Sequence, residues 1–465
     1  MNFYDDLGQF GQTVAFILEN GETMSYASAA GAADAFSTHL DKRELVFLLS
    51  DNCLESVIGY LGCLRSKRPM ALLARNTHPL LLNKLFMAYG PHYIWLPRQQ
   101  AAQFANAKEV YCFLNYVLLE IEGNTAELHE DLALLVTTSG STGSSKFVRL
   151  SYENIASNAQ SIVEYLEIAK DDRAITILPM QYVFGLSIIN SHLQSGAAII
   201  LTTAGVMEKR FWNLFREHKA TSISGVPYTY EILKRLEWHR LELPSLRVFT
   251  QAGGKLSAAL VAEYVGQCRA RGLRFYVMYG AAEATARMSY LPPDVAVEKP
   301  ASIGVAIPGG ELWIEDENGN RITGPEVVGE LFYRGQNVSL GYAQGRNDLS
   351  LGDECKGLLR TGDMAKRDKD GMYYIAGRKS RFVKLFGNRV NLDELEQLIR
   401  EAGIDCACKG DDQLLRIYIT EASRKNEIVP FVQTLTNLHN SGLKTILVEK
   451  IPRNESGKIL YSELP

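Results

Sequence analysis

The sequence contains few of the residues that usually bind transition metals or form disulfide bonds. Its 465 residues include seven cysteines and eight histidines, which are scattered along the chain. The one close cysteine pair, Cys406 and Cys408, lacks the Cys-x-x-Cys spacing and the nearby histidines of a zinc site. We therefore expect reduced, mostly buried thiols and no cysteine-bound metal. The scattered histidines also give no sequence evidence for a Ser-His-Asp or Cys-His hydrolase.

The chain also lacks an excess of positive charge and a long apolar run. Its 49 lysines and arginines stand against 53 acidic residues, for a net charge of -4, which argues against the basic surface of a nucleic-acid-binding protein. No apolar run approaches the ~20 residues that span a bilayer. The segment Met1–Asp6 has neither the basic nor the apolar section of a secretion signal. We expect no nucleic-acid partner, no membrane span and a cytoplasmic location.

What the sequence does contain is an alternation of helical and strand patterns in a chain long enough for two or three domains. With 46% hydrophobic residues, it has ample material for a core. Short apolar runs predict strands at 44–49, 70–73, 132–136, 174–178, 197–201, 222–226 and 247–250. Helical patterns lie between them, for example at 26–40 and 55–64. This alternation predicts an α/β fold with parallel strands.

The pattern of expected helices and strands changes toward the C-terminus. After about residue 300, turn signals separate short strands such as 311–314 and 330–333, which predicts a β-rich subdomain. From about Gly377 the pattern is that of a small α+β domain. Its expected elements are a helix near 391–401, a strand at 414–419 and a helix near 427–438.

The most informative segment is the loop from Thr137 to Lys146, Thr-Thr-Ser-Gly-Ser-Thr-Gly-Ser-Ser-Lys. It follows the apolar strand at 132–136 and precedes a helix expected to begin near Ser151. Small residues let a backbone approach phosphate closely, hydroxyls donate hydrogen bonds and lysine adds positive charge. A flexible Ser/Gly linker is the alternative, although a linker does not usually follow a buried strand and end in lysine. The lysine lacks the Gly-Lys-[Ser/Thr] context of a P-loop, so this predicts a different phosphate-binding loop.

Further motifs follow this loop in a specific order. They are Leu178-Pro179-Met180-Gln181-Tyr182-Val183-Phe184-Gly185, Gln251-Ala252-Gly253-Gly254, Tyr279-Gly280-Ala281-Ala282-Glu283, Gly329-Glu330-Leu331, Gly341-Tyr342, Arg360-Thr361-Gly362-Asp363, Gly377-Arg378 through Lys384, and Pro452 through Lys458. In this order the chain resembles the adenylate-forming superfamily of acyl- and aryl-CoA synthetases, luciferases and the adenylation domains of peptide synthetases. The resemblance covers most of the sequence.

The resemblance implies a two-domain enzyme and a two-step reaction. It places a large N-terminal domain at 1–378, including the β-rich subdomain at about 300–376, and a mobile C-terminal lid domain at 379–465. The implied reaction uses ATP and Mg²⁺ to convert a carboxylic acid to an acyl-adenylate with release of pyrophosphate. The acyl group then passes to a thiol, either of coenzyme A or of phosphopantetheine on an acyl or peptidyl carrier protein.

The resemblance also assigns roles to individual residues. The phosphate loop would hold the β- and γ-phosphates, and Glu283 with Thr138 would bind magnesium. Asp363 would accept hydrogen bonds from the ribose hydroxyls with help from Arg378, and Tyr279 would stack on adenine. The full nucleotide-binding set is Thr138, Ser139, Gly140, Ser141, Thr142, Gly143, Lys146, Gly253, Gly254, Tyr279, Gly280, Ala281, Ala282, Asp363 and Arg378. Ala282 stands where the family commonly has threonine, which removes one hydroxyl from the pocket.

The catalytic set implied by the resemblance is Lys458, Thr142 and Glu283. Lys458 would neutralise charge on the substrate carboxylate and the α-phosphate as their bond forms. Lys384 and Gly387 lie on the loop expected to enter the site for thiol transfer after the small domain rotates. The hinge position is Ser380, where the family usually has aspartate, and domain alternation is still expected because a hinge depends mainly on backbone torsions.

The acyl substrate is the least defined feature. Tyr182, Val183, Phe184 and Gly185 are expected to border its pocket. No acid stands where amino-acid-activating relatives place an aspartate, which favours a fatty, aryl or small hydroxy acid. The short C-terminal domain slightly favours a carrier protein over coenzyme A as acceptor.

Three different functions also fit parts of the sequence. Ala282 and Ser380 fit a regulatory homologue that binds nucleotide without turnover, whereas Lys146, Glu283, Asp363 and Lys458 favour catalysis. The second function is that of an amino-acid adenylation enzyme, and the third is that of a kinase. A kinase would release ADP in place of AMP and pyrophosphate.

Overall fold

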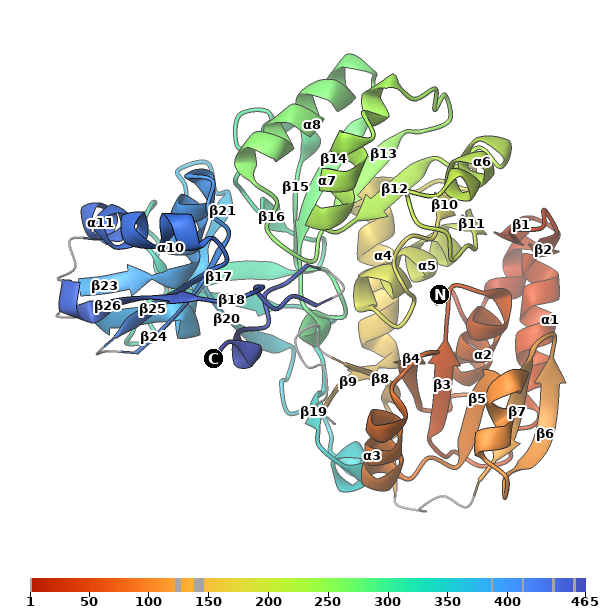
Figure 1. The fold of residues 1–465 in the computed structure, drawn as a ribbon. Coiled ribbons are helices and arrows are strands. Elements are labelled where there is room, and N and C mark those ends of the chain that lie inside the picture. The colour runs from red at the N-terminus through yellow and green to blue at the C-terminus, as the bar shows by residue number, and fades with distance from the viewer. Residues whose placement is uncertain are drawn as a thin grey trace. The chain divides into compact units, whose positions relative to one another are not determined.

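The computed structural model describes residues 2–121, 127–137, 146–385, 388–411, 414–436, 440–454 and 457–465. The chain divides into two compact units (Figure 1). Unit 1 contains Met1–Glu311 and Arg334–Leu359, and unit 2 contains Leu312–Tyr333 and Arg360–Pro465. Each unit has its own sheets and its own core.

The first sheet of unit 1 has the strand order β19-β9-β8-β4-β3-β5-β7-β6. Its strands are β3 (Val46–Ser50), β4 (Met70–Ala74), β5 (Tyr93–Pro97), β6 (Lys108–Phe113), β7 (Tyr116–Glu120), β8 (Leu132–Thr137), β9 (Phe147–Ser151) and β19 (Gly341–Ala343). The central strands β5, β3, β4 and β8 run parallel. Strands β3 and β5 are buried along their whole length, as expected of parallel strands covered on both faces.

The second sheet of unit 1 has the order β16-β15-β14-β13-β12-β10-β11-β1-β2. Its strands are β1 (Val14–Ile17), β2 (Thr23–Ser25), β10 (Arg173–Ile175), β11 (Ala198–Ile200), β12 (Ser222–Gly225), β13 (Val248–Gln251), β14 (Arg274–Tyr279), β15 (Ser289–Leu291) and β16 (Val305–Ala306). Neighbours from β1 through β11, β10, β12 and β13 to β14 are parallel, whereas β2, β15 and β16 join antiparallel at the edges.

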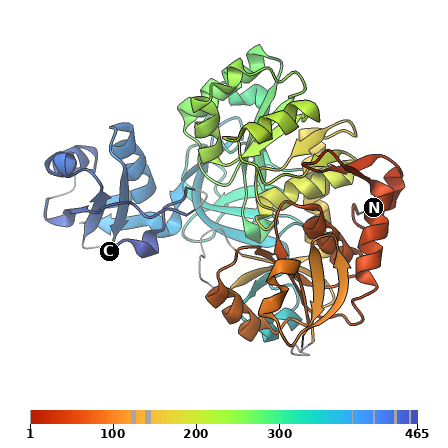
Figure 2. The same ribbon diagram turned by 45° about the vertical axis from the view of Figure 1, so that its right-hand side comes forward.

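A large apolar core lies between the two sheets of unit 1. It joins side chains of both sheets to α1 (Tyr26–Ser37), α2 (Leu54–Arg65), α4 (Tyr152–Leu166) and α5 (Val183–Ser195). Figure 1 and Figure 2 both show α4 and α5 in this middle layer. Helix α3 (Pro79–Tyr89) covers the other face of the first sheet, where alternate residues of β3 and β4 form a separate core.

The second sheet is also covered on both faces. Helices α7 (Pro227–Arg235) and α8 (Ala258–Ala270) cover one face through an aromatic cluster in which Tyr230 and Tyr264 contact Phe249 of β13 and Phe275 of β14. On the α4 face, Tyr165 contacts Tyr276. Helices α6 (Lys209–Glu217) and α9 (Pro293–Ala296) complete this part of unit 1. Both faces of the sheets are thus covered, which leaves the carboxyl ends of the parallel strands as the place where ligands of α/β proteins usually bind.

Unit 2 combines a four-stranded sheet with a small α+β fold. The sheet β17-β18-β20-β21 contains β17 (Glu311–Glu315), β18 (Gly329–Arg334), β20 (Leu358–Arg367) and β21 (Tyr373–Arg378). A hairpin of β22 (Phe382–Leu385) and β23 (Asn388–Asn391) follows. The sheet β24 (Cys406–Gly410), β25 (Leu415–Ile419) and β26 (Leu443–Leu447) packs with α10 (Leu392–Glu401) and α11 (Lys425–Thr436) around an apolar core.

The architecture confirms the predicted α/β fold with mixed and parallel sheets, a β-rich segment after residue 300 and a small α+β domain. Element boundaries differ from the predictions by a few residues, as for the helix expected at 26–40, which ends at Ser37. The β-rich segment falls partly in unit 2, because β18 and β20 are sheet neighbours. A division into moving parts at 378 and 379 stays a prediction.

Candidate functional site

The predicted phosphate loop joins two neighbouring antiparallel strands. Strand β8 ends at Thr137 and β9 begins at Phe147, and these two residues are register partners. The loop residues Thr138, Ser139, Gly140, Ser141, Thr142 and Gly143 lie outside the described residues. The helix expected near Ser151 is α4, whose first turn is capped by the Ser151 side chain, which accepts from the Asn154 amide at 3.0 Å. Strand β9 separates the loop from this helix, which the sequence did not predict.

Lys146 lies at the end of the loop, next to a tyrosine. Its Nζ is 3.3 Å from the centre of the Tyr342 ring, which is a cation–π contact. Strand β19 brings Tyr342 there because it pairs with β9, with Ala343 opposite Phe147. The buried side chain of Arg149 fastens this pairing, donating from Nε to the Tyr342 carbonyl at 3.0 Å.

Tyr342 also reaches the predicted magnesium ligand. Its hydroxyl donates to Oε1 of Glu283 at 2.8 Å. Burial, and next the nearby Glu283 carboxylate, raise the pKa of Tyr342 above its usual range, so it stays protonated as a donor at neutral pH. The structure therefore brings together two of the predicted site residues, Lys146 and Glu283, through a third residue to which the sequence gave no role.

Glu283 is presented by a tight loop after β14. The loop contains a short 3-10 helix at Ala282–Ala284 and two residues with positive φ, Thr285 at 56° and Ala286 at 120°. Such torsions are costly for residues with a side chain and persist when surrounding contacts hold them. Here the Thr285 hydroxyl donates to the backbone carbonyl of Asn337 at 2.7 Å, and the side-chain amide of Asn337 donates to the Ala284 carbonyl at 2.8 Å. The Glu283 carbonyl accepts from the Ser339 amide at 2.9 Å.

The predicted nucleotide-binding residues Tyr279, Gly280, Ala281 and Ala282 lie at the start of this loop. A Cβ added at Gly280 would be 1.7 Å from the Ala286 carbonyl oxygen, so only glycine fits there. Tyr279, the predicted adenine platform, is the last residue of β14 and is half-buried. The Ala282 side chain is buried.

The predicted acyl-pocket residues begin helix α5, and one of them touches a predicted nucleotide-binding glycine. Gly253 has φ of 80°, and a Cβ added to it would be 2.6 Å from the Tyr182 hydroxyl oxygen. A Cβ at Gly185 would be 2.3 Å from the Pro179 carbonyl oxygen. Gly254 follows in the same turn, and its carbonyl accepts from the Gln251 side chain at 2.8 Å. The carboxyl end of β13 and the start of α5 therefore meet in unit 1.

In unit 2, the predicted ribose ligands form an ion pair. Asp363 and Arg378 are register partners across β20 and β21, and Arg378 Nε lies 2.8 Å from Asp363 Oδ1. Gly362 has φ of 69°, and the Thr361 hydroxyl oxygen accepts from the Asp363 amide at 3.0 Å, which fixes this turn. The carboxylate is buried and the guanidinium is exposed.

The predicted hinge residue, Ser380, lies beside an arginine that is anchored in the small fold of unit 2. Arg381 Nε is 2.8 Å from Asp393 Oδ1, its Nη2 pairs with Glu396, and its guanidinium lies 3.9 Å from the centre of the Tyr461 ring. Tyr461 in turn donates to Glu396 Oε2 at 2.8 Å. Lys384 lies on β22, and Gly387 lies outside the described residues. The chain after the hinge is therefore locked to α10.

Replacing Arg381 by methionine should destabilise this part of unit 2 by about 3–5 kcal/mol, because the buried Glu396 would lose its nearer ion-pair partner and keep only Arg400, at 3.6 Å. Hydrogen exchange of the α10 amides would measure the loss. Arg416→Ala, which removes a partly exposed arginine paired with Asp411, is the control and should cost under about 1 kcal/mol. Equal protection of α10 in both variants would contradict the anchoring role.

Lys458 follows a tight turn near the C-terminus. The Lys458 amide donates to Asn454 Oδ1 at 2.8 Å, and the Lys458 carbonyl accepts from the Asn454 amide at 2.9 Å. Gly457 has φ of 80°, which suits glycine at this point of the turn. Arg453 braces the turn through an ion pair with Asp405 at 2.6 Å. The backbone of the closing motif thus has a defined geometry of its own.

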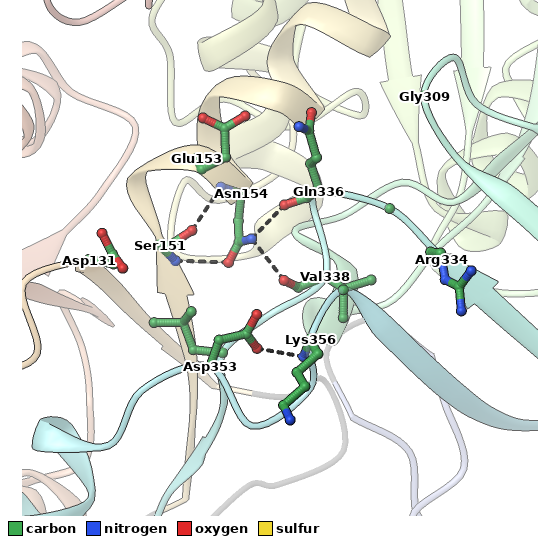
Figure 3. Close-up of a pocket in the computed structure, with 13 residues that line it drawn as sticks. Asp131, Ser151, Glu153, Asn154, Gly309, Arg334, Gln336, Val338, Asp353 and Lys356 are labelled. Carbon is green, nitrogen blue, oxygen red and sulfur yellow. Dashed lines mark hydrogen bonds between the residues drawn. The ribbon is translucent and has the colours of Figure 1, made fainter.

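A polar pocket of about 540 Å³ lies elsewhere in unit 1 (Figure 3). It is lined by acidic residues such as Asp131, Glu153 and Asp353 and by the cations Arg334 and Lys356. No residue predicted from the sequence as a site residue lines it. Its lining includes parts of the segment 334–340, the same segment that supports the Glu283 loop.

The described residues contain no group of three or more His, Cys, Asp or Glu side chains that could hold a metal ion. Mg²⁺ is commonly held by one or two carboxylates together with substrate phosphates and water. Glu283 fits such a site. Among the residues that the structure describes, each helix is too short or too polar to cross a bilayer.

Sequence reasoning missed three residues that shape the site. Tyr342 stood within a recognised motif, yet nothing in its spacing indicated a contact with both Lys146 and Glu283. Arg149 and Asn337 act through backbone carbonyls, which no sequence pattern records. Periodicity identified the strands, but these contacts depend on how β9, β19 and the Glu283 loop meet.

Replacing Tyr342 by phenylalanine should lower kcat/KM for ATP about fivefold to tenfold, because the hydrogen bond to Glu283 is lost while the ring beneath Lys146 remains. Tyr342→Leu removes both and should cost more. Steady-state pyrophosphate release at varied ATP would separate the two variants. Activity of Tyr342→Phe equal to that of the wild type would show that the hydroxyl has no part in positioning Glu283.

Comparison with known proteins gives consistent matches. The family model described as AMP-binding enzyme matches residues 3–343. An oxalate–CoA ligase of Arabidopsis thaliana is 30% identical over 275 residues, which cover 58% of this chain and 52% of the ligase. A 2-succinylbenzoate–CoA ligase of Bacillus pumilus is 28% identical over 338 residues, covering 70% of this chain and 67% of the ligase. The chain thus matches about half the length of the first relative.

The fold has counterparts among solved structures. O-succinylbenzoate coenzyme A synthetase from Bacillus subtilis, in complex with AMP, superposes with a TM-score of 0.80 at 23% identity, covering 100% of this chain and 98% of the synthetase. A structure of the same synthetase with ATP and a magnesium ion gives a TM-score of 0.77 at 22% identity, covering 100% of this chain and 99% of the synthetase. At this level of identity the likeness shows the fold.

Proposed function

The chain belongs to the family of AMP-binding enzymes, and from that premise we propose that it activates a carboxylic acid with ATP and transfers the acyl group to a thiol. In the first step a substrate carboxylate oxygen bonds to the α-phosphorus of ATP, and pyrophosphate leaves. In the second step the thiol sulfur bonds to the acyl carbon, AMP leaves with the electron pair of the broken bond, and the thiol proton passes to solvent.

The observation that carries this proposal is the contact chain from Lys146 through Tyr342 to Glu283. A fixed cation at the end of a hydroxyl-rich loop, beside a carboxylate held by a tyrosine, suits a triphosphate and its metal ion. Lys146 and the loop residues Thr138, Ser139, Gly140, Ser141, Thr142 and Gly143 would hold the β- and γ-phosphates and stabilise pyrophosphate as it leaves. Glu283 and Thr138 would hold Mg²⁺, which when bound neutralises phosphate charge.

The remaining nucleotide contacts are proposed from the geometry of each unit. Asp363 accepts from the ribose hydroxyls, and its ion pair with Arg378 keeps it oriented. Tyr279 stacks on adenine, and the small residues Gly253, Gly254 and Gly280 let the nucleotide approach the backbone. Ala281 and Ala282 line the same turn.

Lys458 serves the first step, by neutralising charge at the reacting carboxylate and α-phosphate. Lys384 and Gly387 serve the second step after rotation about Ser380, with residues 379–465 moving as the lid. The ion pairs of Arg381 support Ser380 as the hinge, because they tie the segment after Ser380 to its domain. A hinge works when that segment and the domain move as one body.

We propose coenzyme A as the first acceptor to test, since both curated relatives described above are named as CoA ligases. Phosphopantetheine on a carrier protein presents the same thiol and is the second. The two relatives are named for different acids, so their names do not identify the acid that this chain activates.

ATP–pyrophosphate exchange across a panel of carboxylic acids tests the proposed function. We expect stimulation by at least one acid, release of AMP when a thiol is added, and no release of ADP. ATP binding without exchange for every acid would instead indicate a regulatory nucleotide-binding protein. Release of ADP would indicate a kinase, and exchange confined to amino acids would indicate an amino-acid adenylation enzyme.

A further inference from the structure

Arg287 is a fully buried cation whose donors are only partly used. The residue is 1% exposed, and its Nε and Nη1 have no hydrogen-bond partner among the described residues. A guanidinium has five N–H donors and no acceptor, and leaving such donors buried and unpaired is costly. Burial lowers the pKa of Arg287 for the same reason, and the nearby oxygens of Tyr165 and Tyr182 oppose this only in part.

Backbone contacts hold Arg287 firmly in this place. It ends the strained turn at Thr285 and Ala286 that presents Glu283 to Tyr342. Two buried amides fix its carbonyl, since the side chain of Asn337 donates to it at 2.7 Å and that of Asn158 at 3.2 Å. One loop therefore orients both the predicted magnesium ligand and the buried arginine, four residues apart.

The guanidinium faces the predicted acyl pocket. Its carbon lies 4.0 Å from the centre of the Phe184 ring, and Tyr182 and Phe184 were both expected to border that pocket. Arg287 also lines a narrow cavity enclosed by α4, α5 and the strands β12 and β13. Because side chains alternate along a strand, Ser224 and Thr250 point into this cavity, while Phe249 lies on the face covered by α7 and α8.

No carboxylate among the described residues neutralises Arg287. The one acid that lines the cavity, Asp172, pairs with Arg247 at 3.3 Å and accepts from the Ala169 amide at 2.9 Å. His192 also lines it, but burial lowers its pKa and favours the neutral ring, whose Nδ1 is bonded to the Ile188 carbonyl at 2.8 Å. The Ser224 hydroxyl accepts from Thr250 at 2.8 Å.

The size of the cavity indicates how much of a ligand it takes. Its volume is about 30 Å³, enough for two or three water-sized positions, since one requires ~10–15 Å³. That space suits a single small polar group and not a whole acyl chain. A group that carries negative charge and two acceptor oxygens would offer the acceptors that the Nε and Nη1 donors lack.

We propose that Arg287 binds a second carboxylate of the acid substrate, so that the activated acid is a dicarboxylate whose far end enters this cavity. The inference rests on the proposed function, because it concerns the acid that is adenylated. A monocarboxylic acid with an apolar end would leave the guanidinium unpaired, and an amino acid would bring an ammonium against it. Arg287 is then a specificity-determining residue, and the attacking carboxylate lies at the other end of the substrate.

The test compares each dicarboxylic acid with its own monoamide, which has nearly the same shape and lacks the second charge. The pairs run from malonate to adipate and include aromatic dicarboxylates. Pyrophosphate exchange should favour the best diacid over its monoamide on the order of 100-fold in kcat/KM. A second readout without turnover is the rise in Tm that each acid produces in the presence of ATP.

The variants separate recognition from packing. Arg287→Met keeps much of the buried volume and should lower kcat/KM for the diacid about 100-fold while changing that for the monoamide far less. Arg287→Lys restores a charge without the planar fork and should recover part of the preference. Arg235→Met, at an exposed position, is the control and should behave as the wild type. If the role of Arg287 were purely structural, Arg287→Met would lower kcat/KM for both acids of a pair by the same factor.

The outcomes distinguish the two proposals. Exchange with monoacids and diacids alike, unchanged in ratio by Arg287→Met, overturns the dicarboxylate inference and leaves the ligase intact. Absence of exchange, with a Tm rise from a diacid that Arg287→Met removes, overturns the ligase and supports the anion subsite. Absence of both signals overturns both.

Discussion

Lys458→Ala is expected to abolish adenylate formation while leaving thiol transfer from a presynthesised acyl-adenylate close to the wild-type rate. Negative charge gathers on the α-phosphate as the substrate carboxylate attacks, and a cation already in place lowers that barrier. Removing one such group typically costs on the order of 100- to 1,000-fold in rate. Once the adenylate exists, the charge that built up in the first step has left with pyrophosphate, so the second step does not need the lysine.

Hydrogen bonds fix the turn that leads to Lys458. The turn from Asn454 is closed in both directions by hydrogen bonds, and Arg453 ties it to Asp405. Alanine at 458 keeps the backbone amide that donates to Asn454, so the turn itself should survive. Circular dichroism and Tm of the variant, compared with the wild type, would confirm that the fold is retained.

The two half-reactions are measured separately, by ATP–pyrophosphate exchange and by thioester formation from added adenylate. Lys450→Ala, at an exposed lysine in the same segment, is the matched control and should leave both rates unchanged. Equal loss of both half-reactions in Lys458→Ala would contradict the role assigned to this residue. Loss of the second alone would assign Lys458 to thiol transfer.

The fold was predictable from the sequence because its signals are local. Buried parallel strands such as β3 and β5 appear as continuous apolar runs, and Ser151 with Asn154 forms a recognisable helix cap. Strand β9 was missed because Phe147–Ser151 is short and adjoins both the loop and the helix. It pairs with β19, nearly 200 residues later in the chain, and local sequence patterns do not predict such a long-range contact.

The site was predictable only as a set of motifs, each with a residue type suited to its chemistry. Sequence order gave Lys146 and Glu283 but not the hydroxyl of Tyr342 that joins them. Arg287 was overlooked because an arginine after a motif normally lies on the surface. Its burial depends on the positive φ torsions of Thr285 and Ala286, which no local propensity predicts. Strain at a functional site is where local rules fail.

Replacing Glu283 by glutamine should lower the rate of pyrophosphate exchange on the order of 100-fold or more and raise the Mg²⁺ concentration required for half-maximal rate. The amide has the same shape and can still accept from the Tyr342 hydroxyl, so the contact at 2.8 Å survives while the charge is lost. A metal ion bound beside phosphates is worth several kcal/mol of charge stabilisation, and its affinity falls when a carboxylate ligand becomes neutral.

Varying Mg²⁺ at fixed ATP in wild type, Glu283→Gln and Tyr342→Phe separates metal binding from positioning. Tyr342→Phe should shift the Mg²⁺ curve little, because it keeps the carboxylate, whereas Glu283→Gln should shift it strongly. The double variant should resemble Glu283→Gln, since the tyrosine acts through the charge that this variant removes. If instead the two single effects multiply, Tyr342 contacts the nucleotide on its own account, and Lys146 and Tyr342 form a phosphate site that does not depend on Glu283.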